Sequence, residues 1–117
     1  MAINNCPFCD IVKGIKSVKR LYDSEKVIAF NDAKPVAPIH ILIIPKKHYP
    51  TLAHIEDDEL RNHLFKVATL LGQAFFKQLG GYQLHVNVGK EGVQKIYHAH
   101  IHLLAGKALM LTEWDGQ

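Results

Sequence analysis

Three histidines near the C-terminus alternate with apolar residues, and they are the residues of this chain best suited to chemistry. His98, His100 and His102 are separated by Ala99 and Ile101. Side chains of a β-strand repeat every second residue, so we expect the imidazoles on one face and the apolar residues in the core. Neighbouring imidazoles would then stand about 6.7 Å apart, too far for all three to chelate one ion.

A row with this spacing suits contact with a chain of phosphate groups. The central imidazole would attack phosphorus as a nucleophile, and its neighbours would donate hydrogen bonds or a proton. Two alternatives stay open. Two neighbouring histidines could share a metal ion, or the row could be the polar face of a half-exposed strand without a chemical role.

The histidine row requires a strand, and the sequence predicts one over residues 96–105. Four other strands are expected from their β-branched or alternating apolar residues, at residues 18–22, 26–31, 40–44 and 82–88. A long helix is predicted from about Asp57 to Gly80, because apolar residues recur there every three or four positions. With a short helix over residues 7–13, this order predicts an α+β domain with an antiparallel sheet.

Length and charge narrow the function classes. The chain has 117 residues, which predicts a single domain over residues 1–117. Its net charge of +3 contains no long basic run, so we expect a small anionic ligand and no nucleic-acid partner. We find neither a run of 18 apolar residues nor a secretory signal, and therefore expect a cytoplasmic protein that does not bind membranes.

Several motifs together identify a family. Residues 98–104 match the pattern His-φ-His-φ-His-φ-φ, in which φ is an apolar residue. Residues 30–35 look like F-x-D-x-x-P, residues 38–48 resemble P-x-H-x-L-x-I-P-K-x-H, and Asn87 with residues 94–97 completes the match. The chain thus resembles the histidine triad (HIT) family over about residues 6–106, followed by a tail at 107–117. The resemblance implies a HIT-like fold with about five antiparallel strands, one long helix and a short N-terminal helix.

Within that family, length and pattern are more similar to the HINT-like purine nucleoside phosphoramidases than to the longer diadenosine-polyphosphate hydrolases. The resemblance implies hydrolysis of the P–N bond of nucleoside 5′-phosphoramidates through a covalent nucleotidyl-histidine intermediate. One alternative is hydrolysis of dinucleoside polyphosphates or nucleotidyl transfer. A second alternative is a non-catalytic, zinc-stabilised module that binds a nucleotide or a partner.

The resemblance also implies residue roles, beginning with four histidines. His100 would be the nucleophile. His102 would contact the scissile bridge and give a proton to the leaving amine. His40 would orient the nucleophile from the neighbouring strand, and His98 would belong to the same site.

Substrate-binding residues follow from the same resemblance. Asp32 would accept hydrogen bonds from the ribose hydroxyls, for which its two carboxylate oxygens are suited. An apolar slot for the purine base would be lined by Phe8, Ile11, Phe30 and Leu42. Phosphate oxygens would be held by Asn87 and Gln94. Lys95 stands where many relatives carry a serine, so the contacts with the leaving group depart from the family pattern.

A structural metal site is predicted at the N-terminus, whereas catalysis needs no cofactor. Cys6 and Cys9 have the C-x-x-C spacing of zinc sites, and zinc normally takes four ligands. The resemblance to some bacterial family members supplies His48 and His98 as the other two ligands. The alternative is two reduced, partly buried thiols.

Two further expectations concern the surface. Small relatives are homodimers, and we expect the helix face of Leu64, Leu71 and Phe75, together with a sheet edge, to form such an interface. The remaining histidines, which are His54, His63 and His85, are expected to be solvated or structural.

Overall fold

The computed structural model describes residues 5–107 and contains the elements of a mixed α+β domain. A short helix, α1 (Pro7–Val12), precedes the strands β1 (Arg20–Asp23), β2 (Val27–Asn31) and β3 (Ile39–Pro45). A 3-10 turn, η1 (Leu52–His54), leads into the long helix α2 (Asp58–Leu79), which is followed by β4 (Gln83–His85) and β5 (Ile101–Ala105). Residues 108–117, most of the expected tail, lie outside the described part of the chain.

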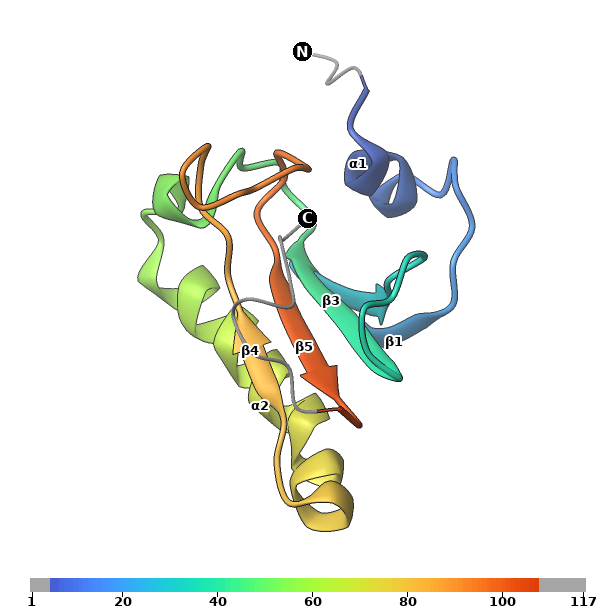
Figure 1. The fold of residues 1–117 in the computed structure, drawn as a ribbon. Helices are drawn as coiled ribbons and strands as arrows, with labels where there is room; N and C mark the ends of the chain where they lie inside the picture. The colour runs from blue at the N-terminus through green and yellow to red at the C-terminus, as the bar shows by residue number, and fades with distance from the viewer. Residues whose placement is uncertain (1–4, 108–117) are drawn as a thin grey trace.

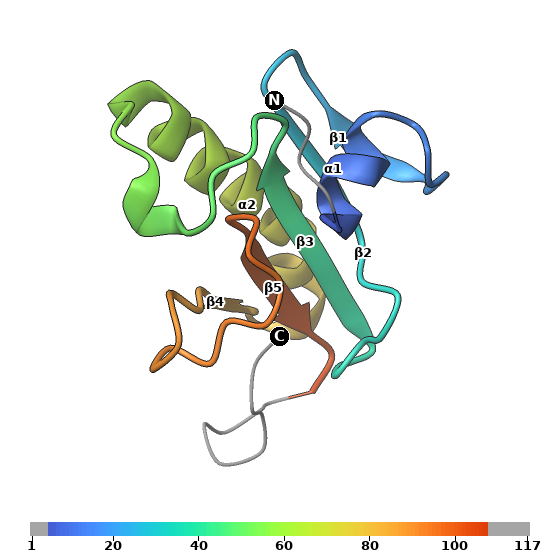
Figure 2. The same ribbon diagram turned by 90° about the horizontal axis from the view of Figure 1, so that it is seen from above.

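The five strands form one antiparallel sheet in the order β1-β2-β3-β5-β4, which confirms the predicted fold class. Alternate residues of each strand point to opposite sides of the sheet, and both sides are covered by a helix. Ala29, Ile43 and Ile101 pack toward α2, whereas Phe30 and Leu42 pack toward α1. Figures 1 and 2 show the two helices on opposite sides of the sheet.

Helix α2 begins and ends as its sequence predicts. The Asp57 side chain caps it by accepting hydrogen bonds from the backbone N–H groups of Glu59 and Leu60. Gly80 ends it with a φ of 84°, a conformation that glycine adopts without steric cost. No helix in residues 5–107 is long and apolar enough to cross a membrane.

Of the α2 face predicted to form a dimer interface, Leu64 is wrong. Leu64 is fully buried in the core, and Leu71 and Phe75 pack against that core. The apolar side chains of α2 that are exposed lie elsewhere, at Phe65, Leu70, Phe76 and Leu79. The long apolar stripe of this helix therefore faces the chain's own sheet, because the sheet offers the nearest apolar surface.

Both C-terminal strands are shorter than predicted, and Pro45 explains why β5 begins only at Ile101. Ile43 faces Ile101 in the antiparallel register, so Pro45 would face Ala99 if the ladder continued. Proline has no N–H to donate. The Ala99 N–H instead donates to the carbonyl oxygen of Tyr49 at 2.7 Å. Residues 96–100 consequently lead into β5 without hydrogen-bonding to β3 as part of the ladder.

Candidate functional site

Of the three alternating histidines, His98 and His100 lie just before β5 and His102 lies within it, and all three are buried. As predicted, the residues between and after them point into the core under α2, namely Ala99, Ile101 and Leu103. The ring centroids of His100 and His102 are only 4.7 Å apart, closer than the strand spacing predicts. His98 faces the cysteines, His100 faces Phe8, and His102 faces His40.

The proton positions on His100 follow from its backbone contact. Its Nδ1 lies 2.6 Å from the carbonyl oxygen of His98, and a carbonyl only accepts, so Nδ1 carries the hydrogen. In the neutral ring, Nε2 then keeps its lone pair. The rings of Phe8 and His100 are perpendicular (90°), with centroids 5.2 Å apart, and this packing holds the plane of the imidazole. Nε2 is therefore the nitrogen of His100 that can act as a nucleophile in the neutral ring.

A second histidine pair forms between two strands. His40 Nε2 of β3 lies 2.9 Å from His102 Nδ1 of β5 and 3.3 Å from the Asp32 carboxylate. Burial is the main cause that lowers the pKa of His102 to about 2, and the nearby His100 and His40 lower it further. Burial also lowers the pKa of His40, although Asp32 opposes that effect. Both rings are therefore neutral at pH 7.

The four residues predicted to line a slot for the base do lie together. Phe8 and Ile11 of α1 pack with Phe30 of β2 and Leu42 of β3 in one buried cluster. The rings of Phe8 and Phe30 meet edge to face, with centroids 5.7 Å apart. Since Phe8 also contacts His100, this cluster is continuous with the histidine row.

The predicted phosphate-binding residues lie in the loop between β4 and β5. The Gln94 amide donates to the carbonyl oxygens of Pro50 and Ile96, and its oxygen accepts from the Gly89 N–H. Asn87 donates to the carbonyl oxygen of Gly92 at 2.8 Å. Both side chains thus hold the loop in shape. Lys95 lies with Cys6 and His48 around a surface cavity.

Val93, in the middle of this loop, has a strained backbone. Its φ is +61°, in the left-handed region that β-branched residues rarely adopt. The loop holds it there through the hydrogen bond from the Val93 N–H to the Lys90 carbonyl oxygen and the Gln94 contacts described above. Such a residue costs about 1–3 kcal/mol of stability.

Replacing Val93 by glycine is therefore expected to stabilise the chain. Relief of the strain exceeds the entropy cost of glycine, for a net gain of about 1 kcal/mol and a rise in Tm of about 4 °C. Calorimetry would measure this rise. The matched control is Val88→Gly, since Val88 is similarly exposed (40% against 43%) and does not have a positive φ. The control is expected to lower Tm, and an equal fall for Val93→Gly would contradict the strain.

The predicted metal ligands converge. Cys6 and Cys9 of the α1 segment meet His48 and His98 in one cluster, with their four ligand atoms within 4.8 Å of one another. The sulfur–Nδ1 distances run from 3.3 to 3.5 Å, and the two Nδ1 atoms are 3.2 Å apart. Tetrahedral zinc, with bonds of about 2.3 Å to sulfur and 2.0–2.1 Å to nitrogen, requires edges of about 3.6 and 3.3 Å. The geometry fits such an ion.

Protonation supports the same fit. His98 Nε2 donates to the Pro45 carbonyl oxygen at 2.8 Å, so Nδ1 directs a lone pair at the two sulfurs. Burial lowers the pKa of His98 to about 4, which keeps the ring neutral as a ligand must be. Burial and the neighbouring Cys6 raise the pKa of Cys9 to about 12, and a bound cation would reverse that effect.

The remaining histidines differ from each other. His54 of η1 bonds to the hydroxyl of Thr51, the residue before η1, and His63 of α2 lies 3.1 Å from the Tyr22 hydroxyl. His85 is nearer the site than expected, because the β4–β5 register places it opposite His102. The position of His85 follows from the pairing of β4 with β5, and the predicted strands alone did not specify the register of that pairing.

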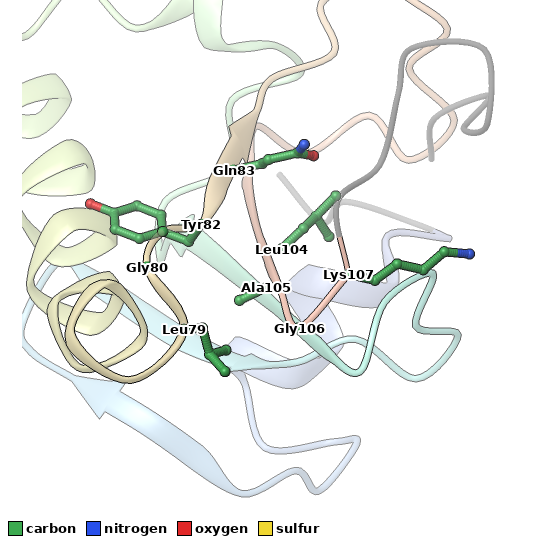
Figure 3. Close-up of a pocket in the computed structure, with 9 residues that line it drawn as sticks. Leu79, Gly80, Tyr82, Gln83, Leu104, Ala105, Gly106 and Lys107 are labelled. Carbon is green, nitrogen blue, oxygen red and sulfur yellow. The ribbon is translucent and has the colours of Figure 1, made fainter.

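A surface cavity at the far end of β5 lacks the histidines of the site described above (Figure 3). It is lined by the C-terminal end of α2, the start of β4 and the residues around Gly106. None of the eight histidines lines it. The chemically equipped site is therefore the one at the start of β5.

The comparisons with known proteins agree with this geometry. A model of the HIT domain matches residues 14–109. A HIT-like protein of Chlamydia pneumoniae is 38% identical over 105 residues, covering 87% of this chain and 94% of that protein. The crystal structure of a HIT family hydrolase from Legionella pneumophila has 38% identity and a TM-score of 0.84, covering 94% of this chain and all of that one. A histidine triad protein from Clostridium difficile has 38% identity and a TM-score of 0.83, covering 94% and 97% of the two chains.

Proposed function

Since the chain belongs to the HIT domain family, we propose that it is a hydrolase that binds purine nucleoside 5′-phosphoramidates and cleaves their P–N bond. The observation that carries this proposal is the state of His100. Its Nδ1–H donates to the His98 carbonyl oxygen, so the lone pair of the neutral ring lies on Nε2. A buried imidazole fixed in this way is a nucleophile that needs no proton removed before it reacts.

The reaction has two balanced steps. In the first, His100 Nε2 forms a bond to phosphorus while the P–N bond of the substrate breaks, and the amine leaves with the bonding pair and takes up a proton from solvent. The His98 carbonyl oxygen, at 2.6 Å from Nδ1–H, stabilises the positive charge that the ring acquires. In the second, a water oxygen forms a bond to phosphorus while the bond between phosphorus and Nε2 breaks. The bonding pair returns to Nε2 and makes the ring neutral again, the water gives up a proton to solvent, and the nucleoside monophosphate leaves.

Two neighbouring groups support a nucleotide as the substrate. Asp32 Oδ2 is buried, makes no hydrogen bond within residues 5–107 and has His40 Nε2 at 3.3 Å as a longer polar contact, so a ribose hydroxyl would give it a full hydrogen bond. The apolar cluster around Phe8 and Phe30 adjoins His100 and offers aromatic edges to a base. A lone phosphate ester would use neither feature.

We also propose a structural zinc ion in the cluster of Cys6, Cys9, His48 and His98. It would join the α1 segment to residues 45–50 and to the start of β5, and all four ligands would come from the chain itself. The ion would act on folding and on the position of His98. Since the His98 carbonyl holds His100, the metal cluster would steady the nucleophile without touching substrate.

We further propose a cytoplasmic homodimer. The apolar side chains of Phe65, Leu70 and Phe76 are exposed on α2, and β4 is an edge strand. A second copy would cover both features around one two-fold axis. The molar mass in solution, measured by light scattering, distinguishes a dimer of about twice 13.2 kDa from a monomer.

A substrate series tests the proposed activity. We expect kcat/KM for adenosine 5′-phosphoramidate to exceed that for a diadenosine polyphosphate by about tenfold or more, because only the former has an amine leaving group. Product release measured by chromatography gives both values. The opposite ratio would favour the polyphosphate hydrolase, and tight nucleotide binding without turnover would favour a binding module.

A further inference from the structure

The loop between β2 and β3 places one backbone N–H against a histidine. The Val36 N–H donates to His40 Nδ1 at 3.1 Å. A backbone N–H is always a donor, so His40 Nδ1 must be an acceptor and carries no hydrogen. In the neutral ring, the single hydrogen of His40 is therefore on Nε2.

That hydrogen determines the protonation of the next ring. His40 Nε2 and His102 Nδ1 are 2.9 Å apart, a distance at which one nitrogen donates and the other accepts. Because His40 Nε2 donates, His102 Nδ1 accepts, and the hydrogen of His102 lies on Nε2. The groups facing this pair from other elements are Asp32, His85 and His100. Because His40 Nε2 carries a hydrogen in this assignment, it has no lone pair with which to bind a metal ion.

We propose that the backbone N–H of Val36 sets the tautomers of His40 and His102 in series, so that His102 presents Nε2–H as a hydrogen-bond donor. This inference rests on the proposed function only for what that donor meets, namely a phosphate oxygen or the leaving group. Val36 is then a positioning residue that acts through two imidazoles. His102 donates a hydrogen bond and keeps its proton, in place of the proton transfer that the family resemblance implies.

The loop is built to keep this N–H in place. Val36 and Ala37 pack against the buried Leu104 of β5. Pro38 lies against Gly106, where an added Cβ would come within 3.0 Å of the proline ring. The Asp32 N–H donates to the His40 carbonyl oxygen at 2.9 Å, and Asp32 Oδ1 accepts from the Lys34 N–H at 2.8 Å. These contacts tie both ends of the loop to the strands that carry the two histidines.

Nitrogen-15 NMR of the histidine rings tests the tautomers directly in the full-length protein at pH 7. A protonated and an unprotonated ring nitrogen have well-separated shifts. We expect Nε2 to be protonated and Nδ1 unprotonated in both His40 and His102. A hydrogen on Nδ1 of either ring would overturn the proposal, whatever the substrate of the protein is.

A second experiment removes only the donor. Replacing Val36 by its α-hydroxy acid converts the amide into an ester and keeps the side chain, whereas Val36→Ala keeps the N–H and is the matched control. We expect the ester variant to show mixed tautomers at His102 and kcat about 10- to 100-fold lower, with a KM changed less than threefold. The Val36→Ala variant should keep the wild-type ring signals.

The outcomes separate this inference from the proposed function. If the rings of the ester variant keep their wild-type tautomers, Val36 does not set them. If the tautomers change as expected but no phosphoramidate is hydrolysed by the wild-type protein, the tautomer relay stands and the proposed function fails. Should the ester variant not fold, the wild-type ring assignment alone still decides the tautomers.

Discussion

Replacing His100 by alanine is expected to lower kcat for adenosine 5′-phosphoramidate by about 10³-fold or more. The substitution removes the only ring whose Nδ1–H is held by the His98 carbonyl while Nε2 keeps its lone pair, within residues 5–107. Loss of a nucleophile removes the covalent route, and neighbouring groups leave a small residual rate. Nucleotide binding should change by less than about tenfold, because the Asp32 carboxylate and the apolar cluster remain.

Two measurements make this result specific. Single-turnover kinetics with a nucleotide labelled at phosphorus should leave label on acid-denatured wild-type protein and none on His100→Ala. The matched control is His54→Ala, since the His54 side chain is exposed, bonds to the Thr51 hydroxyl and lies outside the site. Full activity of His100→Ala, or label on that variant, would exclude the covalent scheme.

The second large effect concerns the metal cluster. Removing zinc, or replacing Cys9 by serine, is expected to lower stability by about 3–4 kcal/mol and Tm by about 10–20 °C. The physical reason is that the ion joins four ligands from segments far apart in the chain, at residues 6–9, 48 and 98. Its binding free energy is therefore folding free energy.

Metal analysis and calorimetry check this expectation together. The protein as purified should contain one zinc per chain, and a chelator should lower its Tm. The Cys6→Ser/Cys9→Ser variant should contain none, and its Tm should not respond to the chelator. Ser24→Ala, a polar substitution in the β1–β2 turn, controls for general mutational loss. A metal-free wild type with two titratable thiols would support the alternative of reduced cysteines.

The fold was largely predictable because its signals are local. The apolar period of α2, its Asp57 cap and its Gly80 end are all read within one segment. The alternation of histidines with Ala99 and Ile101 likewise assigns each side chain to a face. The early end of the β3–β5 ladder could not be read in the same way. It depends on Pro45 standing opposite Ala99, which becomes apparent only when the register is known.

The candidate site was likewise predictable in part. Its members were predictable by type and spacing, and the structure brings Cys6, Cys9, His48 and His98 together. What each imidazole does was less accessible. His40 was expected to orient His100; the structure shows a hydrogen bond between His40 and His102, and His100 Nδ1 donates to the His98 carbonyl oxygen. Of the α2 residues predicted for a dimer interface, Leu64 lies in the core and the partly buried Leu71 and Phe75 pack against it.

The sequence by itself determined which residue types share a strand face and that one long helix packs on the sheet. It also determined that two histidines must join the two cysteines to complete a site with four ligands. These properties depend on spacing along the chain. Only the tertiary structure decided the proton on each ring, because a tautomer depends on the one backbone atom that lies against it. Those atoms are the Val36 N–H for His40, the His98 carbonyl for His100 and the Pro45 carbonyl for His98. A backbone donor or acceptor is the same in every residue type, so no sequence motif records it.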